Sequence, residues 1–203
     1  GAHRELADGG RGFARMPGSD PAGHAVHRAG RVIRIRVWRM KDSAKISVLF
    51  VCMGNICRSP TAEGVFRQQA ETAGLARRLH IDSAGTQGYH AGEAPDRRSQ
   101  AAAARRGYDL GSIRARGVVD VDFERFDLIL AMDEQNRASL QARCPAEHAH
   151  KLQLLLDYSV RFPRQQVPDP YYGGNSGFER VLDMVEDAAT GLLAHLRSRL
   201  AQL

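Results

Sequence analysis

The chain has 203 residues and a mass of 22.3 kDa, with 43% hydrophobic residues, 26% charged residues and a formal net charge of +6. This length suits one domain with a hydrophobic core and leaves little for a second. The mean hydropathy of −0.39, the short apolar runs and only three cysteines argue against a membrane span and against a small disulfide-stapled secreted scaffold, so we expect a cytoplasmic protein.

The charge imbalance lies at the N-terminal end. Of the 29 basic and 23 acidic residues, nine and three fall in residues 1–41, which leaves residues 42–203 with 20 of each. Large aliphatic side chains are nearly missing from residues 1–31, so we expect this segment to be disordered. Residues 32–39 alternate apolar and basic side chains, which suits an edge strand or a membrane-surface or nucleic-acid arm. Because the high isoelectric point comes from this end alone, we expect no nucleic-acid partner and treat the segment before Met40 as an upstream or non-native extension of one folded domain.

The first strand and helix are the clearest elements. The apolar run Ile46–Cys52 predicts a buried strand. Ser59 and Pro60 mark the start of a helix, with Ser59 as its N-cap, Glu63 in its first turn and Gly74 at its end.

The same alternation continues along the chain. We expect further strands at Leu79–Ser83, Phe126–Met132 and Lys151–Leu155, and further helices from Pro95 to about Arg106 and from Asp133 or Glu134 to Pro145. After an irregular stretch, Phe162–Gly177, apolar residues recur at helical spacing from Phe178 to Leu200 and predict a long amphipathic helix. Strands alternating with helices predict an α/β fold, a parallel sheet covered on both faces, with ligands at the carboxyl ends of its strands.

One such end carries the candidate chemistry. Cys52 ends the first strand, and Arg58 and Ser59 stand where the first helix begins. Gly54 and Asn55 tolerate a positive φ angle, so the loop between can turn its backbone N–H groups towards an anion at the helix N-terminus. These groups and the Arg58 guanidinium would lower the pKa of the Cys52 thiol and make it nucleophilic. We therefore expect the Cys52 loop to bind a phosphate or sulfate ion.

Two further side chains fit this chemistry, although the spacing alone is a weak signal. Arg58 presents a planar fork that can hold two phosphoryl oxygens, and Ser59 can donate a hydrogen bond to the sulfur. The plain alternative for Cys52 is a buried core thiol, since cysteine is among the most buried residue types.

The segment VLFVCMGNICRSPTAE at 48–63 closely resembles the signature of the low-molecular-weight protein tyrosine phosphatases. The resemblance extends to 82–86, 126–136 and 167–172 in the family's order and covers about residues 45–200. It implies a three-layer sandwich with a four-stranded parallel sheet in a catalytic domain at 42–203. It also implies hydrolysis of phosphotyrosine in proteins through a phosphocysteine, without metal or organic cofactor. We expect a monomer or weak dimer.

The resemblance also implies roles for particular residues. Cys52 would be the nucleophile, Arg58 the phosphate clamp, and Asp169 the acid that protonates the leaving group and later activates water. Judged alone, an Asp between two prolines is ordinarily a turn residue. The expected substrate-binding residues are Met53, Gly54, Asn55, Ile56, Cys57, Ser59, Tyr89, Tyr171 and Tyr172, with Ser83 as structural support for the loop.

Several of these residues have two interpretations. Tyr89 would sandwich an aryl ring of the substrate together with Tyr171 or Tyr172, or would only pack against its neighbours in the protein. Cys57 would capture an oxidised Cys52 or only fill space. Asn55 and Ser83 would hold the loop in shape, or serve as a turn residue and a cap. We interpret Asp133 and Asn136 as a helix start and a structural group, and expect His90 near the cleft.

Ile113 and Gly117 depart from the family's His-x-Ala-Arg-Gln stretch, so part of the loop-supporting network must differ. Three other functions remain as alternatives. The similar arsenate reductases need two more cysteines close together, and only Cys144 is left here. A phosphoarginine phosphatase is a closer alternative, but Ile56 stands where such relatives carry Thr and leaves room for an aryl ring. The third alternative is a non-catalytic phosphopeptide or nucleic-acid binder. The presence of the nucleophile, the clamp and the acid argues against it.

Overall fold

The structure is a computed structural model that describes residues 45–203. The predicted disorder of residues 1–31, the arm at 32–39 and the start at Met40 lie outside the described residues, and the division at residue 42 stays a prediction. Among the residues described, no helix combines the length and apolar character needed to cross a bilayer.

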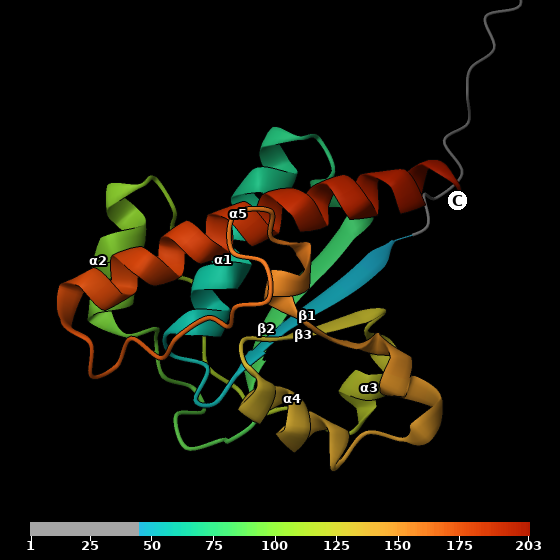
Figure 1. The fold of residues 1–203 in the computed structure, drawn as a ribbon, viewed down its shortest axis with the longest axis horizontal. Coiled ribbons are helices and arrows are strands. Elements are labelled where there is room, and N and C mark those ends of the chain that lie inside the picture. The colour runs from blue at the N-terminus through green and yellow to red at the C-terminus, as the bar shows by residue number, and fades with distance from the viewer. Residues whose placement is uncertain (1–44) are drawn as a thin grey trace, which may run out of the picture. The chain divides into compact units, whose positions relative to one another are not determined.

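Four parallel strands form the central sheet in the order β2-β1-β3-β4 (Figure 1). They are β1 (Ile46–Cys52), β2 (Leu79–Gly85), β3 (Leu128–Ala131) and β4 (Leu152–Leu154). The central strand β1 has the predicted bounds, and its last residue pairs with the last residue of β2. The carboxyl ends of β1 and β2 therefore meet at one edge, where ligands of such sheets bind.

Helices cover both faces of the sheet, as predicted. They are α1 (Arg58–Thr72), α2 (Arg97–Arg105), α3 (Val121–Arg125), α4 (Glu134–Gln141) and α5 (Gly174–Ala201), with short 3₁₀ turns at Ala76–Arg78, Ala146–Lys151 and Leu155–Tyr158. Helices α1 and α5 lie on one side of the sheet and α3 and α4 on the other (Figure 1). The three-layer α/β fold is confirmed.

The core divides along β1, whose alternate side chains point to opposite faces. Val48 and Phe50 belong to the cluster beneath α1 and α5, whereas Leu49 and Val51 belong to the cluster with Phe123 of α3. A strand that is buried on both faces has a continuous run of apolar residues, and this run made β1 the clearest strand to predict from the sequence.

Helix α5 packs closely against the 3₁₀ turn at Leu155–Tyr158. A β-carbon added at Gly191 would lie 1.9 Å from the carbonyl oxygen of Tyr158. Only glycine allows this approach, because any side chain would have to displace backbone atoms.

Several details of the predicted elements differ in the structure. Helix α1 begins at Arg58 with Cys57 as its N-cap, so Ser59 lies inside the first turn and Glu63 lies beyond it. Helix α5 begins at Gly174, inside the stretch that was expected to be irregular. Helix α3 was not predicted, because its single turn is too short to show a helical period.

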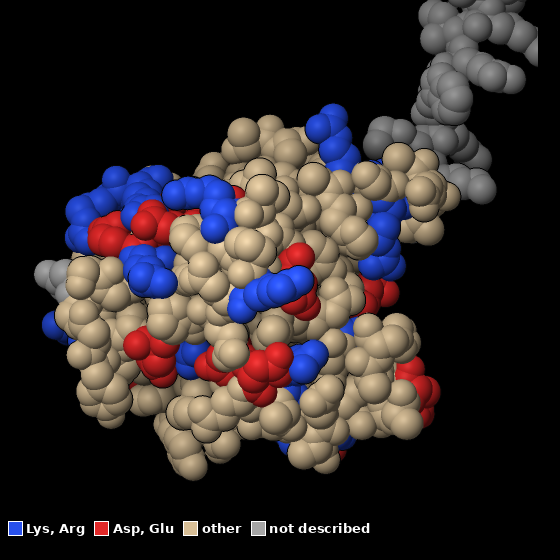
Figure 2. All heavy atoms as spheres, in the orientation of Figure 1, with Lys and Arg blue, Asp and Glu red and all other residues tan. Residues whose placement is uncertain are grey.

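Basic and acidic side chains are interspersed on the face shown in Figure 2. One cluster of them joins α2 to α5: just after α2, Arg106 contacts Glu179 at 2.6 Å and Asp183 and Glu186 at 2.8 Å. Exposed ion pairs stabilise little one at a time, but one guanidinium shared by three carboxylates fixes the position of α2 along α5.

Candidate active site

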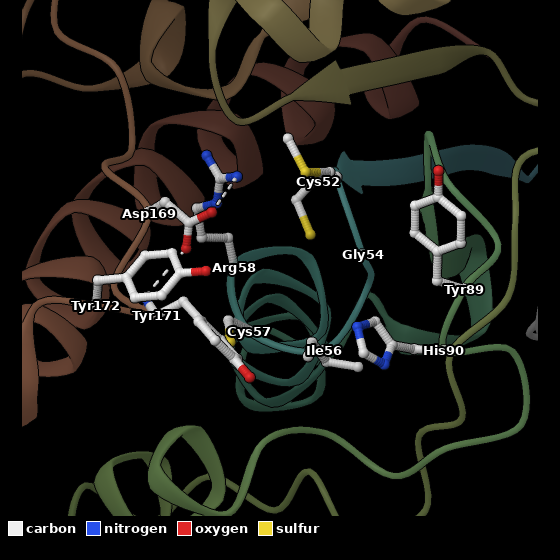
Figure 3. A pocket seen from close by; sticks show the side chains of 11 residues that line it. Cys52, Gly54, Ile56, Cys57, Arg58, Tyr89, His90, Asp169, Tyr171 and Tyr172 are labelled. Atoms are coloured by element: carbon white, nitrogen blue, oxygen red, sulfur yellow. Dashed lines mark hydrogen bonds and ion pairs between the residues drawn. The ribbon is translucent and has the colours of Figure 1, made fainter.

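A pocket of about 210 Å³ opens at the carboxyl end of β1 (Figure 3). Its lining comprises Cys52, Met53, Gly54, Ile56, Cys57, Arg58, Tyr89, His90, Asp169, Tyr171 and Tyr172. The predicted residues Asn55, Ser59 and Ser83 are buried behind this lining. Within residues 45–203, no group of three or more His, Cys, Asp or Glu side chains is arranged to hold a metal ion.

The sulfur of Cys52 lies at the floor of the pocket, in a residue only 2% exposed. The backbone N–H of Asn55 donates to it over 3.3 Å, and the Ser59 hydroxyl lies 3.1 Å away. The loop then enters α1, whose first N–H groups have no partner within the helix. A negative charge on this sulfur, or on a group in front of it, therefore meets hydrogen-bond donors and the positive end of a helix dipole.

Asn55 holds the loop from behind. It adopts a φ angle of +56° and is fully buried. Its side-chain amide nitrogen donates to the hydroxyls of Ser59 and Ser83, both at 2.9 Å, and its oxygen accepts from the Arg116 N–H at 2.9 Å. Asparagine is one of the few residues besides glycine that enters the left-handed region readily, so both its backbone and its side chain suit the position.

A buried carboxylate completes this support. The Ser83 hydroxyl donates to Glu63 at 2.6 Å, and the other oxygen of Glu63 accepts from Arg67, one turn along α1, at 2.9 Å. Ile113, the first departure from the family pattern, is packed in the core, and Gly117, the second, bridges to Gly85. On the Ser83 side the support therefore runs through Glu63 to Arg67, whose guanidinium also donates to the carbonyl of Ile81.

Gly85, the last residue of β2, touches the Cys52 loop directly. A β-carbon there would lie 2.7 Å from the carbonyl oxygens of Met53 and Gln87. Beyond Gly85, the N–H groups of Thr86 and Gln87 donate to the carbonyls of Cys52 and Met53 at 2.8 and 2.9 Å. The chain after β2 thus runs along the loop and fixes it by main-chain hydrogen bonds.

The Arg58 guanidinium is almost fully buried between two carboxylates. It donates to Asp133, to the carbonyl of Val167 at 3.1 Å and to Asp169 at 3.3 Å. Burial alone would lower the pKa of Arg58, but the neighbouring Cys52 and the two carboxylates raise it above its usual value. Asp133 is also the N-cap of α4, as predicted, whereas its contact with Arg58 was not predicted.

Asp169 reaches the pocket from the loop that follows Val167. The Val167 N–H donates to the carbonyl of Met132 at 2.9 Å, which fixes the start of this loop at the end of β3. One oxygen of Asp169 accepts from the Tyr171 N–H at 3.1 Å, and the other faces Arg58. The carboxyl is 49% exposed, so it is open to a ligand in the pocket and to water.

Aromatic side chains form the rim. Tyr89 and Tyr172 are 82% and 94% exposed on opposite sides of the opening, and Tyr171 packs edge-to-face on Tyr172 with ring centroids 5.1 Å apart. His90, beside Tyr89, donates a hydrogen bond from Nδ1 to the Glu93 carboxylate at 2.9 Å. These rings border the opening of the pocket, an arrangement that suits an aromatic ligand.

Cys57 lines the pocket but is largely enclosed. Burial raises the pKa of its thiol to about 12, and the nearby Asp96 carboxylate adds to the increase. A thiol must ionise to attack an oxidised sulfur, so this environment favours the space-filling interpretation of Cys57.

A family model, two relatives and a solved structure all match this chain and all name the same kind of protein. Residues 47–202 match the family model described as low molecular weight phosphotyrosine protein phosphatase. A putative low molecular weight protein-tyrosine-phosphatase of Synechocystis is 47% identical over 156 residues, covering 76% of this chain and 99% of that protein. The human low molecular weight phosphotyrosine protein phosphatase is 42% identical over 150 residues, covering 70% and 90%. A crystal structure of a protein tyrosine phosphatase from Entamoeba histolytica, with Hepes in the active site, matches with a TM-score of 0.74 at 42% identity and covers 78% of this chain and 100% of that one.

Proposed function

Since the chain belongs to the low molecular weight phosphotyrosine protein phosphatase family and is therefore a protein-tyrosine-phosphatase, we propose that it hydrolyses phosphotyrosine in proteins, and small aryl phosphates, through a phosphocysteine on Cys52. One observation carries the proposal. The sulfur of Cys52 and the guanidinium of Arg58, from one loop, line a small pocket together with the carboxyl of Asp169, which lies 111 positions after Arg58.

In the first proposed step the Cys52 thiolate attacks phosphorus, an S–P bond forms and the bond to the aryl oxygen breaks. Asp169 gives its proton to that oxygen, so the product leaves as a neutral phenol. The charge on the phosphoryl oxygens would be held by loop N–H groups and by the fork of Arg58, which Asp133 and the Val167 carbonyl hold at the pocket.

In the second step the Asp169 carboxylate takes a proton from water, which attacks phosphorus and breaks the S–P bond. The leaving group is then the Cys52 thiolate. Hydrogen bonds from the Asn55 N–H and the Ser59 hydroxyl support that charge, which makes the sulfur a better leaving group. Phosphate is the second product.

The rim supports an aryl substrate. The rings of Tyr89, Tyr171 and Tyr172 and the apolar side chain of Ile56 surround the opening, which favours phosphotyrosine over phosphoarginine. A thiol nucleophile must remain reduced, so we place the enzyme in the cytoplasm. That the enzyme is a monomer or weak dimer stays a prediction.

The test uses para-nitrophenyl phosphate and phosphotyrosine peptides, with phosphoarginine and arsenate as competing substrates. Cys52→Ser is expected to abolish turnover, and Asp169→Ala to slow it by a factor of about 10²–10⁴. Cys144→Ser, away from the pocket lining, is the matched control and should keep full activity. Turnover by Cys52→Ser at the wild-type rate, or a preference for phosphoarginine, would contradict the proposal.

A further inference from the structure

Arg98, the second residue of α2, is not part of the pocket lining. Asp96 is the N-cap of this helix and accepts from the Arg98 backbone N–H at 2.8 Å. The same carboxylate also accepts from the side chain of Arg98, from Nε at 3.0 Å and from Nη2 at 2.8 Å. This two-pronged pairing fixes the plane and the direction of the guanidinium.

The other side of the guanidinium faces the loop that carries the proposed acid. Its Nη1 donates to the carbonyl oxygen of Tyr171 at 3.0 Å. Its central carbon lies 5.1 Å from the centroid of the Tyr171 ring and 4.8 Å from that of Phe178, which is buried in the first turns of α5. One side chain therefore joins the start of α2 to the loop and to α5, through a hydrogen bond and two cation–π contacts.

Both ends of this connection reach the site. The Asp96 N–H donates to the carbonyl of Ile56 in the Cys52 loop at 2.7 Å. At the other end, the N–H of Tyr171 donates to the carboxyl of Asp169 at 3.1 Å. Arg98 thus stands between the loop that would hold the phosphoryl group and the residue that would protonate the leaving oxygen.

We propose that Arg98 is a positioning residue for Asp169: it holds the backbone of Tyr171 so that the carboxyl stays over the leaving-group oxygen. The proposal rests on the acid role of Asp169 given above. The acid needs such support because it is half exposed and the chain after it contains two consecutive glycines, one of which, Gly174, has a φ of +64°. A misplacement of about 1 Å can cost a factor of about 10² in rate.

A leaving-group test separates this role from a general structural one. Expulsion of phenol, with a pKa of about 10, needs a proton from the acid, whereas dinitrophenolate leaves without one. We therefore compare kcat/KM for phenyl phosphate and 2,4-dinitrophenyl phosphate, since this constant reports the step that breaks the aryl bond. Arg98→Ala should lower it about tenfold or more for phenyl phosphate and less than about threefold for the dinitrophenyl ester.

Matched variants complete the design. Arg97→Ala removes the neighbouring, exposed guanidinium and should leave both rates unchanged. Arg98→Lys should not restore the phenyl phosphate rate, because an ammonium cannot pair in two-pronged fashion and stack at once. In an Asp169→Ala background, Arg98→Ala should add no further selective loss.

The outcomes are distinct. If Asp169→Ala is selective for phenyl phosphate but Arg98→Ala slows both esters equally, the positioning role is overturned and the proposed function stands. If Asp169→Ala is itself not selective, the acid role fails and the inference with it. Full rescue by Arg98→Lys would also overturn the inference. Should Arg98→Ala fail to fold, Asp96→Asn keeps an N-cap, removes the charge that fixes the guanidinium, and should give the same selectivity to a smaller extent.

Discussion

Replacement of Asn55 by alanine tests whether the Cys52 loop is held from behind. The variant forces alanine into a φ angle of +56°, which costs about 1 kcal/mol. It also leaves the Arg116 N–H without its acceptor, at about 1–3 kcal/mol, and removes the two donor bonds to Ser59 and Ser83, at about 1 kcal/mol each. The structure therefore predicts a loss of roughly 4–6 kcal/mol in the free energy of unfolding.

Urea unfolding measures this loss, and kcat/KM for para-nitrophenyl phosphate measures its effect on the site. Asn55→Gly is the matched variant: it loses the same hydrogen bonds but accepts the positive φ angle, so it should be more stable than Asn55→Ala by about 1 kcal/mol. Both variants should lose activity by about 10²-fold, because the sulfur loses the geometry of its donors. An Asn55→Ala protein within about 0.5 kcal/mol of wild type, with normal activity, would refute the reasoning.

Three other changes have defined outcomes. Burial holds the Cys57 thiol neutral in the folded state, whereas the unfolded thiol ionises between pH 8 and pH 10. Over this range wild type should therefore lose about 1 kcal/mol more unfolding free energy than Cys57→Ala. Equal losses for the two proteins, measured by urea unfolding at each pH, would contradict this. Asp133→Asn keeps the cap of α4 but removes a charge from Arg58, and should lower kcat/KM about tenfold or more; an unchanged value would show that the pair is not needed. Gly191→Ala should lower the unfolding free energy by about 1–3 kcal/mol, because its β-carbon meets the Tyr158 carbonyl; a normal melting temperature would exclude that close contact.

Local patterns predicted the parts of the fold that depend on neighbours in sequence. Strand β1 is a continuous apolar run, and the amphipathic part of α5 has apolar residues at helical spacing. Both elements were therefore predicted from the sequence, and the structure contains both. The start of α1 was misplaced by a local rule. A serine before a proline looks like an N-cap, but here the N-cap is Cys57, two residues earlier, and the Ser59 hydroxyl faces the sulfur.

The residues behind the pocket could not be predicted in the same way. Asp133 lies 75 positions from Arg58, and Tyr171 lies 73 positions from Arg98, so no spacing rule connects them. The pairing exists only because β3 lies beside β1 and α2 lies against α5. Glu63 was assigned to the helix dipole, although the fold turns it inwards to meet Ser83. Contacts of this kind follow from topology and not from local sequence.

Where Gly85 meets the Cys52 loop, the contact consists of carbonyl and amide groups, so this part of the anion-binding loop is held by main-chain atoms. The side chains of Asn55 and Ser83 add to this support from behind. The exposed rim residues Tyr89 and Tyr172 are not among these supports. Recognition of the phosphoryl group and choice of the attached target are thus separable properties, so target preference can diverge during evolution while the chemistry is retained.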